Sequence, residues 1–279
     1  MKNNFNLKRI FYLLTRQIFL KFLYKFKYKL SKTISEKKLL NFLYTLRPYR
    51  SNNSLIRLGE ESDGGYLIPN DLEDIKGCFT AGVGDKAKFE LDLADKGITC
   101  FMADYSVTGP PISHKNFNFI KKFIKNENGN YSINIDEWIN KNKHLSYDYI
   151  LKIDIEGDEY SVLTNISKKN LLQMRIIIFE IHEFTDVLNP KGFILTNNLF
   201  KKLQESHTIV HINPNNNSPS IKFSKKLELY DCMEITMLRN DRILQKEPED
   251  NFPHKLDHKF NNFFKSKLPK CFYKKSNEI

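Results

Sequence analysis

Three short segments carry glycine, acidic or histidine residues at spacings that could support chemistry. They are Gly82-Val83-Gly84-Asp85, Lys152-Ile153-Asp154-Ile155-Glu156 and Glu180-Ile181-His182, and each lies at the end of a strand-like apolar run. The carboxyl ends of parallel strands meet at one edge of an open α/β sheet, where ligands bind. We therefore expect the three segments to contribute to one site.

The glycine segment predicts binding of an adenosine-containing ligand. Gly82 and Gly84 let the backbone approach a ligand closely, and the helical pattern that follows offers free N–H groups. The next strand-like run ends in Asp104, about twenty residues further on, where an acid can bind ribose hydroxyls. The third glycine of a dinucleotide fingerprint is missing, because Ala87 occupies its position.

Asp154 is the most informative acid of the second segment. Asp154 and Glu156 point to the same face of a strand at its carboxyl end. The acids that follow, Asp158 and Glu159, are explained by the first turn of the next helix, where the helix dipole favours negative charge. That explanation does not extend to an acid inside the strand.

The histidines are candidates for proton transfer. His182 shares a face with Glu180 and could deprotonate a hydroxyl near neutral pH. His211 and Asn213 end the following strand-like run and are expected to project in the same way. Together with Asp154, these side chains would also suit a hard divalent cation. No metal is expected, because spacing across three strands defines no coordination geometry.

Alternating strand and helix patterns predict an open, mostly parallel sheet with helices on both faces. The last two strands have no helix-length pattern between them, so an antiparallel hairpin is expected to close the sheet. The expected strands are 66–68, 78–81, 98–103, 117–124, 149–155, 175–181, 208–213 and 227–238, and the expected helices are 86–96, 135–140, 158–165 and 193–205.

The net charge of +11 over 279 residues belongs to the ends of the chain. Residues 1–30 carry eight basic side chains and no acid, and residues 250–279 carry seven basic and three acidic ones. The remainder holds 29 basic and 30 acidic side chains, which argues against a nucleic-acid partner. The four cysteines are far apart, so neither a zinc knuckle nor a disulfide framework is indicated and a cytoplasmic location is expected.

The amino-terminal segment has two interpretations. Residues 5–45 read as helical, and no run of about eighteen apolar residues predicts a membrane span. The basic, aromatic-rich residues 1–30 could lie on the inner face of an anionic membrane, or the helix could pack on its own domain. The expected organisation is a basic lead-in at 1–50, a domain at 51–245 and a basic tail at 246–279.

Taken in order, these segments and their neighbours resemble the FkbM-type family of S-adenosylmethionine-dependent methyltransferases. The resemblance covers residues 55–240, and Lys-Ile-Asp-Ile-Glu-Gly is its most specific part. The matching segments are Arg57-Leu58-Gly59, Asp63-Gly64-Gly65-Tyr66, Gly82-Val83-Gly84-Asp85, Phe89-Glu90-Leu91, Leu151 to Glu159 and Glu180-Ile181-His182.

The resemblance implies a class I methyltransferase fold, which is a Rossmann-like α/β sheet with an antiparallel last strand. It also implies S-adenosylmethionine as cofactor and methyl transfer to oxygen, commonly of a sugar hydroxyl. Carried over by position, the cofactor-binding residues are Asp63, Gly65, Tyr66, Gly82, Gly84, Asp85, Glu90, Asp104 and Tyr105, and the catalytic candidates are Asp154, Glu180, His182 and His211. His182 is the candidate base, and Asp154 is expected near the methyl group.

The leading hypothesis is therefore an O-methyltransferase acting on a sugar or a surface-glycan precursor. A nicotinamide-dependent nucleotide-sugar oxidoreductase or epimerase is the second, although it usually needs the third turn glycine and a Tyr-x-x-x-Lys pair. The third is a non-catalytic membrane-surface binding protein that keeps a methyltransferase-like fold.

Overall fold

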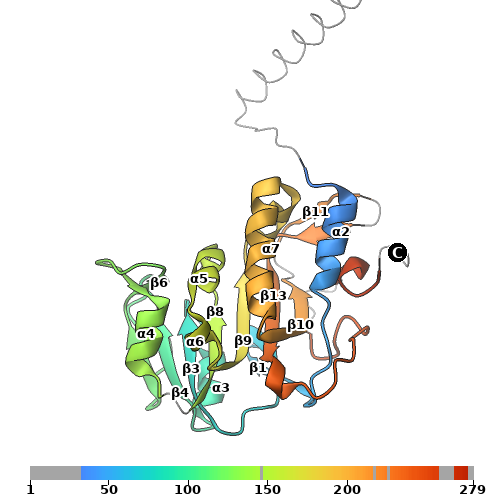
Figure 1. The fold of residues 1–279 in the computed structure, drawn as a ribbon. Coiled ribbons are helices and arrows are strands. Elements are labelled where there is room, and N and C mark those ends of the chain that lie inside the picture. Colours follow the sequence, from blue (N-terminus) through green and yellow to red (C-terminus); the bar gives the residue numbers. More distant parts are fainter. Residues whose placement is uncertain (1–32, 145–146, 216–217, 225–226, 258–266, 276–279) are drawn as a thin grey trace, which may run out of the picture.

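A computed structural model describes residues 33–144, 147–215, 218–224, 227–257 and 267–275 (Figure 1). Its centre is a seven-stranded sheet with the strand order β10-β13-β9-β8-β3-β4-β5. Strands β9, β8, β3, β4 and β5 are parallel to one another, whereas β13 is antiparallel to both β9 and β10. The expected open, mostly parallel sheet with an antiparallel strand is confirmed.

The elements follow one another in the expected alternation. The strands of the central sheet are β3 (Ile75–Ala81), β4 (Thr99–Ala103), β5 (Phe117–Ile120), β8 (Asp148–Ile153), β9 (Met174–Ile181), β10 (His207–Pro214) and β13 (Met233–Arg239). The short strand pairs are β1 (Leu55–Gly59) with β2 (Gly65–Pro69), β6 (Phe123–Lys125) with β7 (Ser132–Asn134), and β11 (Ser220–Lys222) with β12 (Glu228–Tyr230). The helices are α2 (Glu36–Thr45), α3 (Lys88–Ala94), α4 (Ile135–Asn142), α5 (Glu159–Asn165), α6 (Lys168–Leu171) and α7 (Pro190–Gln204), with 3₁₀ turns η1 (Phe184–Leu188), η2 (Asn240–Arg242) and η3 (Lys270–Phe272).

Two hydrophobic cores lie on opposite faces of the sheet. On one face, Trp138 of α4 and Phe200 of α7 are buried in the same cluster as Phe179 of β9 (Figure 1). On the other face, Phe89 of α3 packs with Ile178 of β9 and with the β1–β2 hairpin. All eight residues of β9 are buried, as expected of a strand that is covered on both faces.

Two details of the strands differ from expectation. The expected antiparallel hairpin does close the sheet, but its second strand, β13, lies inside the sheet between β9 and β10, so the first strand, β10, is the edge strand. The run 117–124 is not one strand either, because the chain leaves the sheet after β5 and β6 pairs with β7. The side chain of Lys122 donates to the carbonyl oxygens of Gly129 and Asn130, which holds this departure from the sheet.

Parts of both outer segments belong to the main core. Leu39 and Phe42 of α2 are buried with Phe272 of η3 in the cluster that covers the sheet. For residues 36–45, the structure thus shows a helix packed on its own domain. Residues 5–32 of the expected amino-terminal helix, and with them the membrane interpretation, lie outside the described residues. Within the described part of the chain, no helix has the length and apolar character needed to span a membrane.

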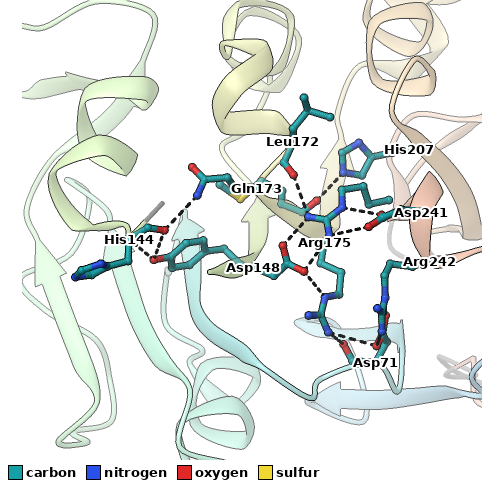
Figure 2. A network of polar contacts seen from close by, with 12 residues as sticks. Asp71, His144, Asp148, Leu172, Gln173, Arg175, His207, Asp241 and Arg242 are labelled. Atoms are coloured by element: carbon teal, nitrogen blue, oxygen red, sulfur yellow. Dashed lines mark hydrogen bonds and ion pairs between the residues drawn. The ribbon is translucent and has the colours of Figure 1, made fainter. Parts of the chain in front are cut away.

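A network of ion pairs ties together the amino-terminal edge of the sheet (Figure 2). Arg175 at the start of β9 places Nε 2.8 Å from Asp148 Oδ2 and Nη1 3.3 Å from Asp71 Oδ1. Arg239 at the end of β13 donates to both oxygens of Asp148, at 2.6 and 2.9 Å. Arg242 donates to both oxygens of Asp71, at 2.8 and 2.6 Å. The network joins β8, β9, β13 and the segment after β2.

Candidate active site

Two adjoining cavities open at the carboxyl-terminal edge of the sheet, opposite the ion-pair network. The first has a volume of about 250 Å³ and is bounded by the β1–β2 turn and the glycine turn. The second has a volume of about 400 Å³ and is bounded by β6 and the turn between β8 and α5. The residues common to both walls are Gly82, Asp104, Ser106, Asp154 and Glu156. The glycine segment and the segment from Lys152 to Glu156 therefore meet here, whereas Glu180 and His182 lie outside both walls.

The glycine turn is shaped by the crowded ends of three strands. Gly82 has a φ of 82°, and a Cβ atom at this position would lie 1.7 Å from the carbonyl oxygen of Asp154. Its N–H donates to the carbonyl of Ala103 at 3.0 Å, while the N–H of Asp154 donates to Ala81 at 2.9 Å. Only glycine fits at position 82, because the backbones of β3, β4 and β8 converge there.

Asp104 at the end of β4 holds the glycine turn in place. Its Oδ2 accepts hydrogen bonds from the N–H groups of Val83 and Gly84, each at 2.9 Å. Its Oδ1 accepts from the N–H and the hydroxyl of Ser106, each at 2.7 Å. Burial alone would raise the pKa of Asp104, but these hydrogen bonds lower it below its usual value. Asp104 lines both cavities, and its contact with a ribose stays a prediction.

Glu159 shapes the second turn at the sheet edge and was underestimated by sequence reasoning. The side chain is fully buried and accepts hydrogen bonds from Ile155 N at 3.1 Å and from Gly157 N at 2.8 Å. This supports the turn in which Glu156 and Gly157 both have positive φ. Its Oε1 also lies 2.8 Å from Nδ1 of His182. The available signal was its position at the helix start, from which a glutamate can reach back to preceding amides.

His182 projects from the end of β9 toward the carboxylates of the β8–α5 turn. Its Nε2 lies 3.9 Å from Asp154 Oδ1 and 3.5 Å from Glu156 Oε2. Burial lowers the pKa of His182, but the hydrogen bond to Glu159 and the surrounding negative charges outweigh burial and raise it to about 9. A positive charge bound in the cavity would bring this pKa down again.

Asp154 and Glu180 form a second group of carboxylates at the same edge. The hydroxyl of Tyr66 donates to Glu180 Oε1 at 2.8 Å and lies 3.4 Å from Asp154 Oδ2. Burial raises the pKa of Asp154, the charge of Glu180 raises it further, and Lys152 and His182 oppose the shift, leaving a value of about 7. A cation in this cavity would favour the ionised form of Asp154.

Sequence reasoning missed Glu234 as a member of this edge. Glu234 on β13 is the register partner of Glu180 on β9. Burial raises its pKa to about 8, with the charge of Glu180 as the next cause. The signal was present, because Glu234 is an acid within the largely apolar run of β13.

Glu90 does not lie in the cofactor site, where the resemblance to the family placed it. Its side chain is fully buried on the inner side of α3 and lines neither cavity. Glu90 Oε1 accepts hydrogen bonds from the Thr80 hydroxyl at 3.0 Å and from Lys152 Nζ at 3.2 Å. The prediction of a cofactor contact at Glu90 is wrong in this structure, because the residue faces the sheet. Its partner Lys152 is the residue that reaches the first cavity.

His211 is also separated from the other catalytic candidates. It lies on edge strand β10, beyond the inserted β13, so its strand is not the neighbour of β9. Its Nε2 is 2.8 Å from Asp257 Oδ1, and it lines a different cavity of about 430 Å³ between residues 50–55 and 249–256. The expectation that His211 joins His182 at adjacent strand ends is therefore wrong.

The remaining predicted cofactor residues divide into two groups. The residues that line a cavity are Asp63, Tyr66, Gly82, Gly84, Asp85 and Asp104. Gly65 instead packs inside the β1–β2 turn, where a Cβ would lie 1.8 Å from Glu60 O. The ring of Tyr105 packs in a tilted orientation on that of Phe123, with ring centroids 5.1 Å apart, and Phe123 is a cavity residue that sequence reasoning did not single out.

The mostly parallel sheet with antiparallel β13 between β9 and β10, and the glycine turn at its carboxyl-terminal edge, match the class I methyltransferase fold that the resemblance implies. Residues 61–197 match the family model described as the methyltransferase FkbM domain. This stretch of the chain is thus an FkbM methyltransferase domain, and the protein is an S-adenosylmethionine-dependent methyltransferase. The resemblance noted in the sequence is confirmed, and the nicotinamide-dependent alternative is set aside.

Other comparisons add little to this assignment. Curated protein sequences give no significant match. Among solved structures, a fibrillarin/Nop5p complex is similar at 12% identity and a TM-score of 0.37, over 60% of this chain and 73% of that chain. A fibrillarin pre-rRNA processing protein of Methanococcus jannaschii has 12% identity and a TM-score of 0.38, over 75% and 87%. A putative methyltransferase from an antibiotic biosynthesis pathway of Anabaena variabilis has 10% identity and a TM-score of 0.27, over 65% and 66%. Structural similarities with TM-scores this low support no argument about function.

The two cavities fit the cofactor that the family implies. The second cavity has Ala103, Ile124 and Ile155 in its walls, which suit an apolar adenine ring. The first cavity has Asp63 and Asp154 in its walls, which suit the positive charges of the methionine end. A side chain at Gly82, which lies in the walls of both cavities, would collide with the backbone of Asp154.

Potential cation ligands gather in the same place. Ligand atoms of Asp154, Glu156 and His182 lie within 4.8 Å of one another, as do those of Glu180, His182 and Cys232. Both sets share His182, so they form one cluster beside the first cavity. These groups are also suitably placed to face a sulfonium.

Proposed function

We propose that this methyltransferase transfers a methyl group to a hydroxyl oxygen of a sugar or of a surface-glycan precursor. The observation that carries the proposal is His182, whose Nδ1 is engaged by Glu159 while Nε2 lies 3.9 Å from Oδ1 of Asp154, a residue in the walls of both cavities. A sugar hydroxyl is a poor nucleophile and needs a base at the acceptor position. An imidazole held in this way can serve as that base.

The chain's own groups would act as follows. When bound, S-adenosylmethionine supplies an activated methyl group, and its sulfur departs as a neutral thioether. His182 Nε2 accepts the proton of the acceptor hydroxyl while the oxygen forms its bond to the methyl carbon. Asp154 and Glu156 stabilise the resulting imidazolium, because their oxygens lie 3.9 and 3.5 Å from Nε2. Positive charge therefore stays within one set of carboxylates throughout the step.

The raised pKa of His182, about 9, is compatible with a base because the cofactor is itself a cation. A sulfonium beside Asp154 shares the carboxylates that hold the imidazolium. The pKa of His182 then falls toward neutrality, and Nε2 becomes free to accept a proton.

We also propose that residues 1–30 hold the enzyme against an anionic membrane, where lipid-linked acceptors would be found. The support is their charge of eight basic side chains without an acid. The full chain is expected to co-sediment with vesicles of phosphatidylglycerol and not with vesicles of phosphatidylcholine. Equal recovery with both vesicle types would contradict this part of the proposal.

The central test is methyl transfer by the purified full chain. S-adenosylhomocysteine should bind in isothermal titration, and label from [methyl-³H]-S-adenosylmethionine should appear in a panel of monosaccharides and nucleotide sugars. The product should show an O–CH₃ group by NMR. His182→Gln should keep S-adenosylhomocysteine affinity within about threefold and lose about 100-fold or more in turnover, as is typical when a general base is removed. A methylated nitrogen in the product, or full activity in the variant, would contradict the proposal.

A further inference from the structure

We infer that Glu159 is a positioning residue that fixes the tautomer of His182 and supports its positive charge during methyl transfer. This inference rests on the proposed function, in which His182 is the base. Sequence reasoning explained Glu159 by the helix dipole alone, and the structure gives it a more specific task.

The contacts of Glu159 dictate where His182 carries its proton. The carboxylate is fully buried, and its Oε1 lies 2.8 Å from Nδ1 of His182. A carboxylate that already accepts from Ile155 N and Gly157 N has only acceptor capacity to offer a third group. Nδ1 must therefore be the protonated nitrogen, and the lone pair of the neutral imidazole lies on Nε2.

The groups around Nε2 leave its lone pair available to the hydroxyl of the methyl-acceptor substrate. Its nearest charged neighbours, Asp154 Oδ1 at 3.9 Å and Glu156 Oε2 at 3.5 Å, are acceptors and offer no proton when ionised. A hydroxyl placed between them would be the donor that Nε2 lacks. The opposite tautomer would direct an N–H toward the acceptor oxygen and could not remove its proton.

Glu159 is one of several charges that act on the ring. Asp154 and Glu156 face it from the β8–α5 turn, Glu180 precedes it on β9, and Cys232 approaches from the segment before β13. Glu159 is set apart from these groups because, of the residues that the structure describes, it is the acid that lies within hydrogen-bonding distance of Nδ1. Its removal should change the tautomer as well as the charge.

Glu159 also has a structural contribution, because two of its three hydrogen bonds are to backbone amides of the turn. A loss of activity in a variant is therefore not sufficient evidence. The test needs a property of the imidazole itself that a purely structural role would leave alone.

The first measurement is histidine ¹⁵N NMR on the full chain without acceptor, with the His182 signals assigned from His182→Gln. In the wild type, the neutral ring is expected to carry its proton on Nδ1. In Glu159→Gln, the titration midpoint of His182 should fall by about one pH unit, because a neighbouring negative charge is lost. A wild-type proton on Nε2, or an unchanged midpoint in the variant, would overturn the inference. The tautomer of His182 in the wild type tests the inference even if Glu159→Gln does not fold.

The second measurement is the pH profile of kcat/KM with the acceptor found in the activity screen. Glu159→Gln should move the acid limb to lower pH and lower kcat at least tenfold, with S-adenosylhomocysteine affinity kept within threefold. Glu137→Gln is the matched control, because it removes an acid from the first turn of α4, where the side chain is 38% exposed. A loss that is uniform across pH would assign Glu159 a structural role only. If the NMR midpoint shifts but His182→Gln stays active, the proposed function fails and the positioning of His182 does not.

Discussion

The two edges of the central sheet use charge in opposite ways. At the amino-terminal edge, carboxylates alternate with guanidinium groups in one network, namely Asp71, Asp148 and Asp241 with Arg175, Arg239 and Arg242 (Figure 2). At the carboxyl-terminal edge, a larger set of carboxylates surrounds two basic side chains, namely Asp154, Glu156, Glu159, Glu180 and Glu234 around Lys152 and His182. In the first arrangement the opposite charges balance. The second arrangement has an excess of negative charge, which favours binding of a cation.

The pKa values express the same difference. Burial would raise the pKa of Asp148, but hydrogen bonds from Arg239 and Arg175 lower it below its usual value. At the other edge, burial and neighbouring carboxylates raise the pKa of Asp154 to about 7 and that of Glu234 to about 8. One protein thus stabilises its fold with paired charges and keeps unbalanced charges for the ligand that its chemistry requires.

The largest effect is expected from breaking the paired edge. Arg175→Met removes the side chain that joins Asp71 and Asp148, both of which lose a partner in a largely buried setting. Stability should fall by about 3–5 kcal/mol in urea unfolding, as is typical when one partner of a buried ion pair is removed. The affinity of the folded protein for S-adenosylhomocysteine should not change.

An exposed pair provides the control for Arg175. The side chain of Arg50 is 52% exposed and pairs with Glu249. Arg50→Met should change stability by less than about 1 kcal/mol. Weakened cofactor binding by Arg175→Met without a loss of stability would contradict the separation of the two edges.

The next largest effect is expected from crowding the glycine turn at the cofactor site. Gly82→Ala would place a Cβ 1.7 Å from the Asp154 carbonyl, at a φ of 82°. S-adenosylhomocysteine affinity should fall about 100-fold, equivalent to about 2.8 kcal/mol. Gly84→Ala is the comparison, because no heavy atom lies within 4 Å of its Cβ position and only backbone strain is added. Equal losses for the two variants in isothermal titration would show that crowding at Gly82 is not the cause.

The pH dependence of stability should have opposite signs at the two edges. Because the pKa of Asp154 rises from 3.8 to about 7 and that of Glu234 from 4.5 to about 8 on folding, their contributions are complete in acid and are lost as the pH rises through those values. The lowered pKa of Asp148 makes a contribution that is present above 3.8 and is lost in stronger acid.

Urea unfolding at pH 5, 6, 7 and 8 would resolve the carboxyl-terminal edge. Glu234→Gln should reduce the decline of stability over this range, because its side chain no longer ionises. A slope identical to that of the wild type would show that Glu234 is not held in its neutral form.

The smallest effect is expected at the aromatic wall of the second cavity. Phe123 lines this cavity and is 41% exposed. Phe123→Ala should weaken S-adenosylhomocysteine binding about three- to tenfold, in line with about 0.5–1.5 kcal/mol for an aromatic contact. Tyr147→Ala, at an equally exposed ring outside both cavities, should leave the affinity unchanged. Equal effects of the two substitutions would argue against a ligand at Phe123.

Local patterns predicted the fold and half of the site. The apolar runs with turn glycines were sufficient to place β3, β8 and β9, and the acid expected inside a strand singled out Asp154, which the structure places directly after the end of β8. These inferences hold because strand ends and helix starts are encoded by neighbouring residues.

The incorrect predictions concern residues whose positions depend on contacts between segments that are distant in the sequence. The insertion of β13 between β9 and β10 is a property of strand order, and it carries His211 away from His182. The burial of Glu90 depends on which side of α3 meets the sheet, and the role of Glu159 depends on a histidine 23 residues further along. No local spacing encodes these three facts.

The contacts on the free side of edge strand β10 determine how far the protein can be shortened without exposing that edge. The N–H of Tyr49 donates to the carbonyl of Ile209 at 2.8 Å, and Tyr49 in turn forms a bridge with Pro248. Backbone of the amino-terminal segment thus contacts the free side of the edge strand at Ile209, and the carboxyl-terminal segment pairs with that backbone in turn. A fragment trimmed to residues 51–245 would lose this contact and leave the Ile209 carbonyl without its partner, at an edge where another chain can add a strand. The contact at Tyr49 is therefore one that a shortened protein should keep.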